Sequence, residues 1–340
     1  MEAYMQSVKN ERGTVLIFAT LIIVLLLVMV GMGLDTGHLA YVRSQGQPAV
    51  DAAALAAAAA IPSNNVTTVR DQATKFNPGG TNPGPGNNYV SSPTNKITDK
   101  SVTLVKYDPT TTTVTTSGVT IANANGVRVA LENNNPYGGT VEAAMKSPLF
   151  LTPLFNLLGQ TTSATADVSV SAVGVIRALP GLPIAISQSL CGTNATLDFQ
   201  SGGSSTSGWE TYYIANSSTS QVRALWDALP FCSGQPLVDV GYCGNIANGV
   251  NATIFNQILQ PMFQANPSDC YLLPVIQNAG NFNQCQTIID WAQFCPAPGA
   301  AAFPGQGKLY GKVTCGQSTW TSRDTKCYVP FLVRDTKSGM

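Results

Sequence analysis

The first sixty residues contain one long apolar run followed by a segment rich in small residues. Residues 15–34 read VLIFATLIIVLLLVMVGMGL, with no charged residue and no proline. At about 1.5 Å per residue a helix of this length extends over about 30 Å, the thickness of the hydrocarbon core of a bilayer. The pattern predicts a transmembrane helix at residues 14–34, preceded by a cytoplasmic lead at residues 1–13.

A cleaved secretory signal is the main alternative for this run. Such signals have an apolar region of about 7–15 residues followed by a small-residue cleavage site, which Gly31 and Gly33 could imitate. The run is longer than that, and no Ala-x-Ala follows it directly. We therefore expect an uncleaved anchor, with a buried helix of a soluble domain as a weaker alternative.

Basic residues on either side of the run indicate its orientation. Lys9 and Arg12 precede it, and Arg43 follows it. Because Lys and Arg are enriched on the cytoplasmic side of membrane helices, the N-terminus is expected in the cytoplasm. The chain then reads as a single-pass protein of the cytoplasmic (inner) membrane, with its bulk periplasmic or extracellular.

The segment at residues 35–62 is predicted to form an Ala-rich juxtamembrane helix. Ala49–Ile61 is dense in alanine, the best helix former, and Pro62 follows it. Gly46-Gln47-Pro48 is a place where a helix can kink or restart. Small residues four apart let helices approach closely. The helix-packing candidates of this kind are Gly33, Gly37, Ala49, Ala53 and Ala57. Either a partner helix or the chain's own β-domain could cover this face.

Alternating apolar and polar positions predict strands beyond residue 63. Val127, Val129 and Leu131, for example, alternate with polar or small residues, as in a half-buried strand. Strands are expected at residues 101–107, 111–116, 126–131 and 163–176, and helices at 66–76 and 141–158. Helices packed on one side of a small antiparallel sheet would bury both apolar faces, which predicts an α+β domain at residues 63–178.

Residues 179–183, LPGLP, are predicted to be a domain junction, and a second domain is expected at residues 184–340. Short strands are predicted there at residues 211–215, 237–240, 271–276, 308–314 and 329–333. One helix is predicted at residues 252–263, and residues 201–208 are expected to be a surface loop. The overall fold class is α+β, with this second domain β-rich.

All eight cysteines lie after residue 190. They are Cys191, Cys232, Cys243, Cys270, Cys285, Cys295, Cys315 and Cys327. An even number confined to one region predicts disulfides formed in an oxidising compartment, and the sequence leaves their pairing open. No C-x-x-C occurs and the single histidine, His38, lies far upstream, so a structural zinc site is not expected.

The composition narrows the function classes. The chain is 44% hydrophobic and 11% charged with zero formal net charge, against about 25% charged residues in typical soluble domains. Thr, Ser, Asn, Gly and Pro make up the difference, which is typical of secreted or surface β-rich proteins. No basic patch is available to neutralise phosphates, so nucleic acid is not an expected partner.

No catalytic constellation is expected, and no cofactor. A triad would have to use His38 at the membrane boundary, where an interfacial role is the simpler interpretation. No phosphate-binding glycine loop occurs. Asp35 could pair with a basic residue of a partner, but we expect it to be solvated at the interface. The acidic residues of the second domain are too scattered to suggest a carboxylate pair: Asp198, Glu210, Asp227, Asp239 and Asp269.

Three elements near the N-terminus resemble one family. They are Arg12-Gly13 before the apolar run, Asp35-Thr36-Gly37 after it, and Gln47-Pro48-Ala49-Val50-Asp51 continuing through Ala60. Together they resemble the N-terminal region of TadG-like and TadE/G-like proteins of bacterial Tad (Flp) pilus assembly. The resemblance implies a membrane-anchored, non-enzymatic component, other Tad pilus-assembly or pilin-like proteins as partners, and a pilin-like domain at residues 63–178.

One departure from the pattern bears on the role. Processed prepilins carry Glu five residues after the cleavage-site Gly, whereas Gly13 is followed by Thr-Val-Leu-Ile-Phe. An assembly factor or minor subunit therefore fits better than the major pilin. A surface adhesin that binds a ligand through its C-terminal domain is the alternative, and an anchored extracytoplasmic enzyme is a third. An exposed aromatic patch near Trp209, Trp226 or Trp320 would favour the adhesin, and a deep polar pocket the enzyme.

Overall fold

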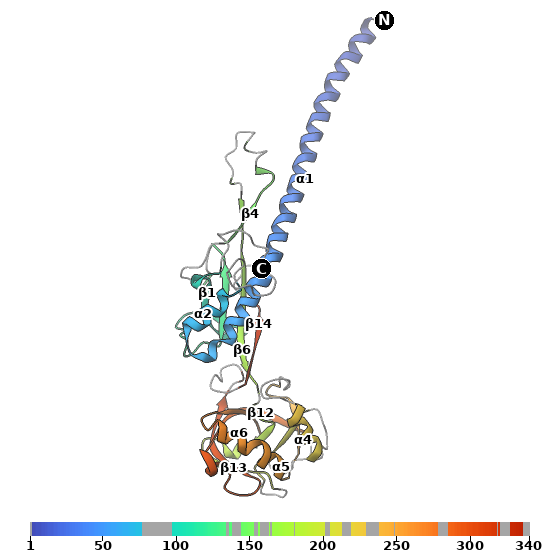
Figure 1. Ribbon diagram of the computed structural model, residues 1–340. Coiled ribbons are helices and arrows are strands. Elements are labelled where there is room, and N and C mark those ends of the chain that lie inside the picture. The colour runs from blue at the N-terminus through green and yellow to red at the C-terminus, as the bar shows by residue number, and fades with distance from the viewer. Residues whose placement is uncertain are drawn as a thin grey trace.

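A computed structural model of the protein shows three parts in succession (Figure 1). A long helix projects from a central sheet, and a second β-domain lies at the end opposite the N-terminus. The structure describes residues 2–76, 97–133, 136–137, 144–152, 156, 163, 165–179, 181–200, 205–212, 219–228, 238–247, 249–277, 285–317, 319 and 327–335.

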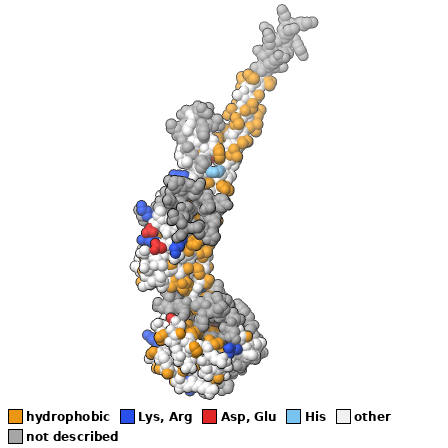
Figure 2. All heavy atoms as spheres, viewed as in Figure 1, with side chains coloured by type: hydrophobic (Ala, Val, Ile, Leu, Met, Phe, Trp, Pro, Cys, Tyr) orange, Lys and Arg blue, Asp and Glu red, His pale blue; other side chains and the backbone are white. Residues whose placement is uncertain are grey.

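The N-terminal helix α1 (Glu2–Ala59) is continuous through the predicted transmembrane and juxtamembrane segments. Pro48 lies inside it without dividing it. Apart from the half-buried Val28, the large apolar side chains from Val15 to Leu34 are exposed, and Figure 2 shows hydrophobic side chains along this stretch of the helix. By length and composition, α1 is able to cross a membrane.

The central sheet has five strands in the order β14-β6-β3-β1-β2, all antiparallel. Their bounds are β1 (Val102–Asp108), β2 (Thr113–Thr115), β3 (Gly126–Leu131), β6 (Val170–Ala178) and β14 (Tyr328–Val333). The C-terminal part of α1 packs on this sheet together with α2 (Val66–Thr74), whose N-cap Asn65 accepts hydrogen bonds from two backbone N–H groups. The predicted arrangement of helix on antiparallel sheet is confirmed.

The prediction of a helix at residues 141–158 is wrong for the strand that the structure shows there. Met145–Pro148 is strand β4, which pairs antiparallel with β5 (Thr165–Val168). Pro148 has no N–H to donate to a helix. The backbone groups of this segment instead bond to β5, and the apolar composition of the segment alone does not reveal that pairing. An ion pair between Lys146 and Asp167 joins the two strands.

The second β-domain is built on a seven-stranded sheet in the order β10-β9-β7-β11-β12-β13-β8. The bounds are β7 (Ile184–Ser187), β8 (Asn194–Asp198), β9 (Ser207–Tyr212), β10 (Cys243–Ala247), β11 (Tyr271–Ile276), β12 (Cys285–Pro296) and β13 (Lys308–Gln317). Because β10 also pairs with β12, the five strands β10-β9-β7-β11-β12 close into a ring, which we call the barrel.

Helices cover one side of this sheet. They are α5 (Ala252–Ile254), a π-helical turn (Phe255–Leu259) and α6 (Gln260–Ala265), as the sequence predicts for residues 252–263; α4 (Thr219–Ala228) is a further helix of this domain. Trp209 lies in the core beneath them and donates from Nε1 to the Gly249 carbonyl at 2.8 Å. It is therefore a core residue, while Trp320 and the side chain of Trp226 lie outside the described residues.

Two further expectations for this domain are wrong. Ser207 and Gly208, expected in a surface loop, are buried in β9 because they pair with β7 at the centre of the sheet. Residues 238–240, expected in a strand, are not in one, although Val238 is buried against Leu272 and Trp291.

The second domain differs from the expected boundaries at its C-terminal end. Strand β14, expected within residues 184–340, instead pairs with β6 along its whole length, from Tyr328 opposite Ala178 to Val333 opposite Val173. The strands β7–β13 are thus inserted between two neighbouring strands of the central sheet. We call residues 184–317 the inserted domain.

A buried ionic cluster fixes the returning chain. Arg128 on β3 donates to Asp335, just beyond β14, at 2.6 Å and to both carboxylate oxygens of Glu132 at 2.7 and 2.8 Å. Tyr137 and Ser171 also donate to Asp335. Burial would lower the pKa of Arg128, but these carboxylates outweigh it, and the pKa is raised.

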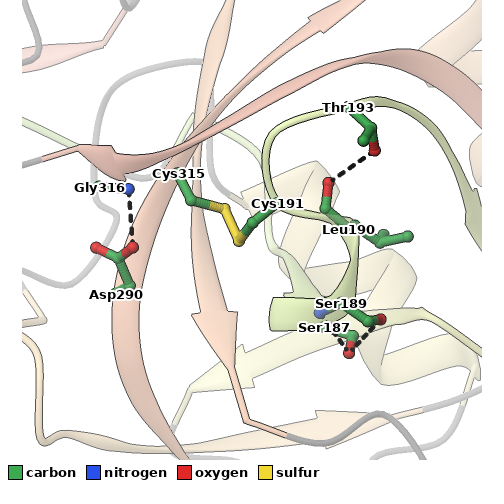
Figure 3. The surroundings of a disulfide bond; sticks show 8 residues. All are labelled: Ser187, Ser189, Leu190, Cys191, Thr193, Asp290, Cys315 and Gly316. Atoms are coloured by element: carbon green, nitrogen blue, oxygen red, sulfur yellow. Dashed lines mark hydrogen bonds between the residues drawn. A yellow bond between two sulfur atoms is a disulfide. The ribbon is translucent and has the colours of Figure 1, made fainter.

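Among the described residues, three disulfides with both cysteines placed join elements of the inserted domain, as the cysteine pattern predicts. The pairs are Cys191–Cys315, Cys243–Cys285 and Cys270–Cys295. Figure 3 shows the first, which joins the turn before β8 to β13, close to the hydrogen bond from the Gly316 N–H to Asp290. Cys327 is also disulfide-bonded, and Cys232 lies outside the described residues.

Candidate functional site at the junction of the membrane helix and the β4 turn

Asp35 lies directly after the apolar run and contacts the end of strand β4. Its carboxylate is 9% exposed and accepts hydrogen bonds from the backbone N–H groups of Phe150, at 2.5 Å, and Leu151, at 3.2 Å. The expectation of a solvated aspartate is wrong. A carboxylate beside apolar surface is costly to bury unless donors satisfy it, and two main-chain N–H groups do so here.

His38 lies one turn further along α1 and contacts the same strand end. Its Nδ1 and the hydroxyl of Ser147 share a hydrogen bond of 2.8 Å, and Ser147 is fully buried. The imidazole also meets the ring of Phe150 edge-on, with centroids 5.7 Å apart. The single histidine of the chain thus helps to hold β4 against α1.

Two glycines allow the close approach. A Cβ on Gly31 would lie 2.6 Å from Cγ of Leu151, and a Cβ on Gly46 would collide with Met145. The glycines selected from the sequence, Gly33 and Gly37, have open space at this position. We define the α1–β4 junction as Gly31, Asp35 and His38 on α1, with Ser147, Phe150 and Leu151 opposite them.

The small-residue face continues from the junction onto the central sheet. Ala49, Ala53 and Ala57 are all buried, and the first of them is the most exposed at 4%. A Cβ on Gly174 of β6 would collide with the Ala54 carbonyl, so helix and strand nearly touch. Of the two partners considered for this face, the structure shows the chain's own sheet.

Polar residues of the same helix also bond to the sheet. Gln47 donates from Nε2 to the Ser171 carbonyl and to Asp51, both at 2.8 Å. Burial raises the pKa of Asp51, and the hydrogen bond from Gln47 opposes that rise. The part of the Tad-like segment that follows the apolar run is therefore bonded to the rest of the chain, through Asp35, His38 and Gln47.

The signal that would have identified the junction is the spacing of one helical face. Positions 31, 35, 38, 42, 46, 49, 53 and 57 are three or four apart, so they lie along one side of α1. A spacing of four residues taken alone also predicts Gly33 and Gly37, which lie off this side. The contact with β4 was missed because residues 141–158 were expected to be helical.

No metal-binding cluster of His, Cys, Asp and Glu occurs within the part of the chain that the structure describes. The acidic residues of the inserted domain lie in separate surroundings. Asp198 pairs with Lys308 at 3.6 Å, and Asp239 pairs with Arg177. Glu210 is buried without a hydrogen-bond partner, and desolvation raises its pKa to about 8. Among the described residues, these three carboxylates do not contact one another.

These features define an α+β protein whose single N-terminal helix carries an exposed apolar run and a buried small-residue face. Residues 13–60 match the family model described as "Putative Flp pilus-assembly TadE/G-like". The N-terminal region is thus TadE/G-like, which supports a component of a Tad (Flp) pilus system. The matched segment lies within α1 and its immediate end, and no curated protein and no solved structure matches the chain.

Proposed function

We propose that this protein is a membrane-anchored, non-enzymatic assembly component or minor pilin-like subunit of a Tad (Flp) pilus system. The observation that carries the proposal is the dual use of α1. Its first part exposes an apolar surface long enough to cross a bilayer, and its second part packs on the central sheet and shares its hydrophobic core. A helix built in this way couples an extracytoplasmic fold rigidly to the membrane.

The disulfides support the proposed orientation. Structural disulfides form and persist in oxidising compartments, so the inserted domain belongs outside the cytoplasm. Lys9 and Arg12 before the apolar run favour the same orientation, with the N-terminus inside. A reporter that is active only in the cytoplasm, fused after Met340, is expected to be inactive, and its activity would contradict the orientation.

A structural role is favoured over catalysis by the contacts of the chemically versatile groups. The single histidine is hydrogen-bonded to Ser147 at the junction, and Asp35 is occupied by two backbone N–H groups. Both groups hold one part of the chain against another. The Tad resemblance adds pilus-assembly or pilin-like proteins as the proposed partners.

Deletion of the coding gene in the native host tests the proposal. Pili counted by electron microscopy are expected to be lost or greatly reduced, and a plasmid copy should restore them. A complementing copy with Val24→Lys and Leu25→Lys should fail, because each charge at the centre of a span costs about 2.5–3.5 kcal/mol. Lys106→Glu, an exposed change on β1, is the matched control and should restore pili. Normal piliation without the gene would overturn the proposal.

The same strains distinguish the two roles within the proposal. Pili sheared from the cells contain a minor subunit but not an assembly factor that stays in the membrane. Immunoblots of the sheared and membrane fractions, with antibody against the inserted domain, therefore assign the role.

The position of the inserted domain favours an adhesin as the second candidate. This domain lies at the end of the molecule opposite the apolar part of α1, where a surface ligand would be met first (Figure 1). Fab fragments against the inserted domain should then block attachment of cells to surfaces without changing the number of pili. Unchanged attachment at saturating Fab would remove this candidate.

A further inference from the structure

We propose that the turn after β4, centred on Phe150, is a second membrane contact that lies in the lipid interface beside α1. The proposal rests on the proposed function in one respect, because it requires that residues 15–34 span the bilayer. It adds a lipid-binding surface outside the spanning helix.

The depth of the turn follows from its contacts with α1. Leu151 packs against Gly31, which lies inside the apolar run, and Phe150 is bonded to Asp35, the first residue after the run. Four residues of helix rise by about 6 Å, so the two contacts bracket the outer end of the run. If that run fills the hydrocarbon core, Phe150 lies at its outer boundary.

Phe150 is also one of the few large apolar side chains outside α1 that are exposed among the described residues. Among the described residues outside α1, the large apolar side chains that are exposed are Phe150, at 58%, Val240 and Leu332. Phe150 is the one that contacts the end of the spanning segment, through its bond to Asp35 and its ring contact with His38. Its ring therefore extends an apolar surface that lipid already covers in the proposed topology.

Backbone N–H groups of the turn, and the Ser147 hydroxyl beside it, have hydrogen-bond partners within the protein, as a poorly hydrated environment requires. Unpaired backbone N–H groups are strongly unfavourable in hydrocarbon, which excludes irregular chain from the bilayer unless hydrogen-bond partners are supplied. The N–H groups of Phe150 and Leu151 donate to Asp35, and the Ser147 hydroxyl is bonded to His38. An aqueous turn would not require these partners, since water would replace them.

Depth-dependent fluorescence quenching tests the contact in the full-length, disulfide-bonded protein. Phe150→Cys is labelled with an NBD fluorophore, and the protein is reconstituted in phosphatidylethanolamine–phosphatidylglycerol vesicles that contain lipids with a nitroxide at a shallow or a deep acyl position. Val24→Cys reports the spanning helix, and Thr113→Cys, exposed on β2, is the control away from the junction. Circular dichroism and titration of free thiols before labelling verify folding.

The expected result is a loss of fluorescence at residue 150 that is larger with shallow than with deep nitroxides. Residue 24 should lose more with deep nitroxides, and residue 113 should lose nothing with either. Quenching at residue 24 without quenching at residue 150 would overturn the lipid contact and leave the anchor intact. A label at residue 150 that is shielded from aqueous iodide but not quenched by nitroxide lipid would assign residue 150 to a contact with protein, within the chain or with a second copy, which also overturns the proposal. Absence of quenching at residue 24 would overturn the anchor and the lipid contact together.

Discussion

Asp35 is a single carboxylate that both ends the apolar run and holds the turn after β4. It ends the apolar run of α1 in sequence, and its two hydrogen bonds hold the turn after β4 in space. Because hydrogen bonds to a charged group contribute about 1.5–3 kcal/mol each, this contact is a substantial part of the local stability at the junction.

Replacement of Asp35 is therefore expected to loosen the β4 turn locally. In Asp35→Ala the amides of Phe150 and Leu151 lose their acceptor, and their hydrogen-exchange protection should fall by about 10–100-fold. Asp35→Asn, which keeps one acceptor oxygen without the charge, should give an intermediate loss. Amides of β3 serve as the internal control, and equal losses there would indicate global destabilisation instead.

Glu210 is a second carboxylate with an unusual environment, inside the barrel. It lies opposite Ile246 in the β9–β10 register, and a Cβ on Gly244 would lie 2.7 Å from its Oε1. Both carboxylate oxygens are buried without a hydrogen-bond partner, and desolvation raises the pKa to about 8. The side chain is therefore protonated at neutral pH in the folded protein.

This protonation predicts a pH dependence of stability. Between the ordinary pKa of 4.5 and the folded value of about 8, the folded state keeps a proton that the unfolded state has lost. The free energy of unfolding should consequently fall by several kcal/mol as the pH rises through this window, and then level off. Glu210→Gln should flatten this dependence in urea denaturation of the full chain in detergent. A wild-type stability that does not fall between pH 5 and about pH 8 would contradict the assignment.

At the scale of elements, α1 is one helix with two different surfaces. Its exposed apolar part was predictable from length and composition, because a run without charges has few alternative environments. Its buried face was predictable only as a stripe of small residues, and the covering partner came from strands more than a hundred positions away, such as β6. Residues 141–158 were misassigned because β4 forms only through pairing with β5, a non-local contact that local propensity does not contain.

The close approach of α1 to β6 predicts a strict size limit at Gly174. Gly174→Ala would press a methyl group into the backbone of Ala54, and overpacking of this kind costs about 1–3 kcal/mol. Gly33→Ala is the matched control, since open space surrounds that position and alanine favours the helix. Thermal unfolding followed by circular dichroism should separate the two variants, and equal transition temperatures would contradict the close contact.

At the scale of the whole molecule, the pairing of β14 with β6 connects both ends of the inserted domain to the central sheet. The cysteine pattern predicted the disulfide-bonded domain, but it contained no information that the last strand pairs with β6. The buried partners Arg128 and Asp335 are separated by 207 positions, so only the folded topology identifies them.

Loss of Asp335 should therefore destabilise the central sheet rather than only its edge. Asp335→Ala leaves Arg128 buried with a single carboxylate partner, and breaking a buried ion pair costs about 3–5 kcal/mol. Asp71→Ala, an exposed change on α2, is expected to leave the free energy of unfolding unchanged. A loss at Asp335 that equals the loss at Asp71, measured by urea denaturation, would contradict the role of the cluster.

The insertion between β6 and β14 also has a mechanical consequence. Two covalent connections, one leaving Ala178 and one entering Tyr328, link the inserted domain to neighbouring strands of the central sheet. A pull on that domain is shared between the two strands. After a single proteolytic cut the domain stays attached, either covalently through β6 or through the pairing of β14 with β6. A domain attached at two strands thereby tolerates damage that would release a domain carried on a single linker.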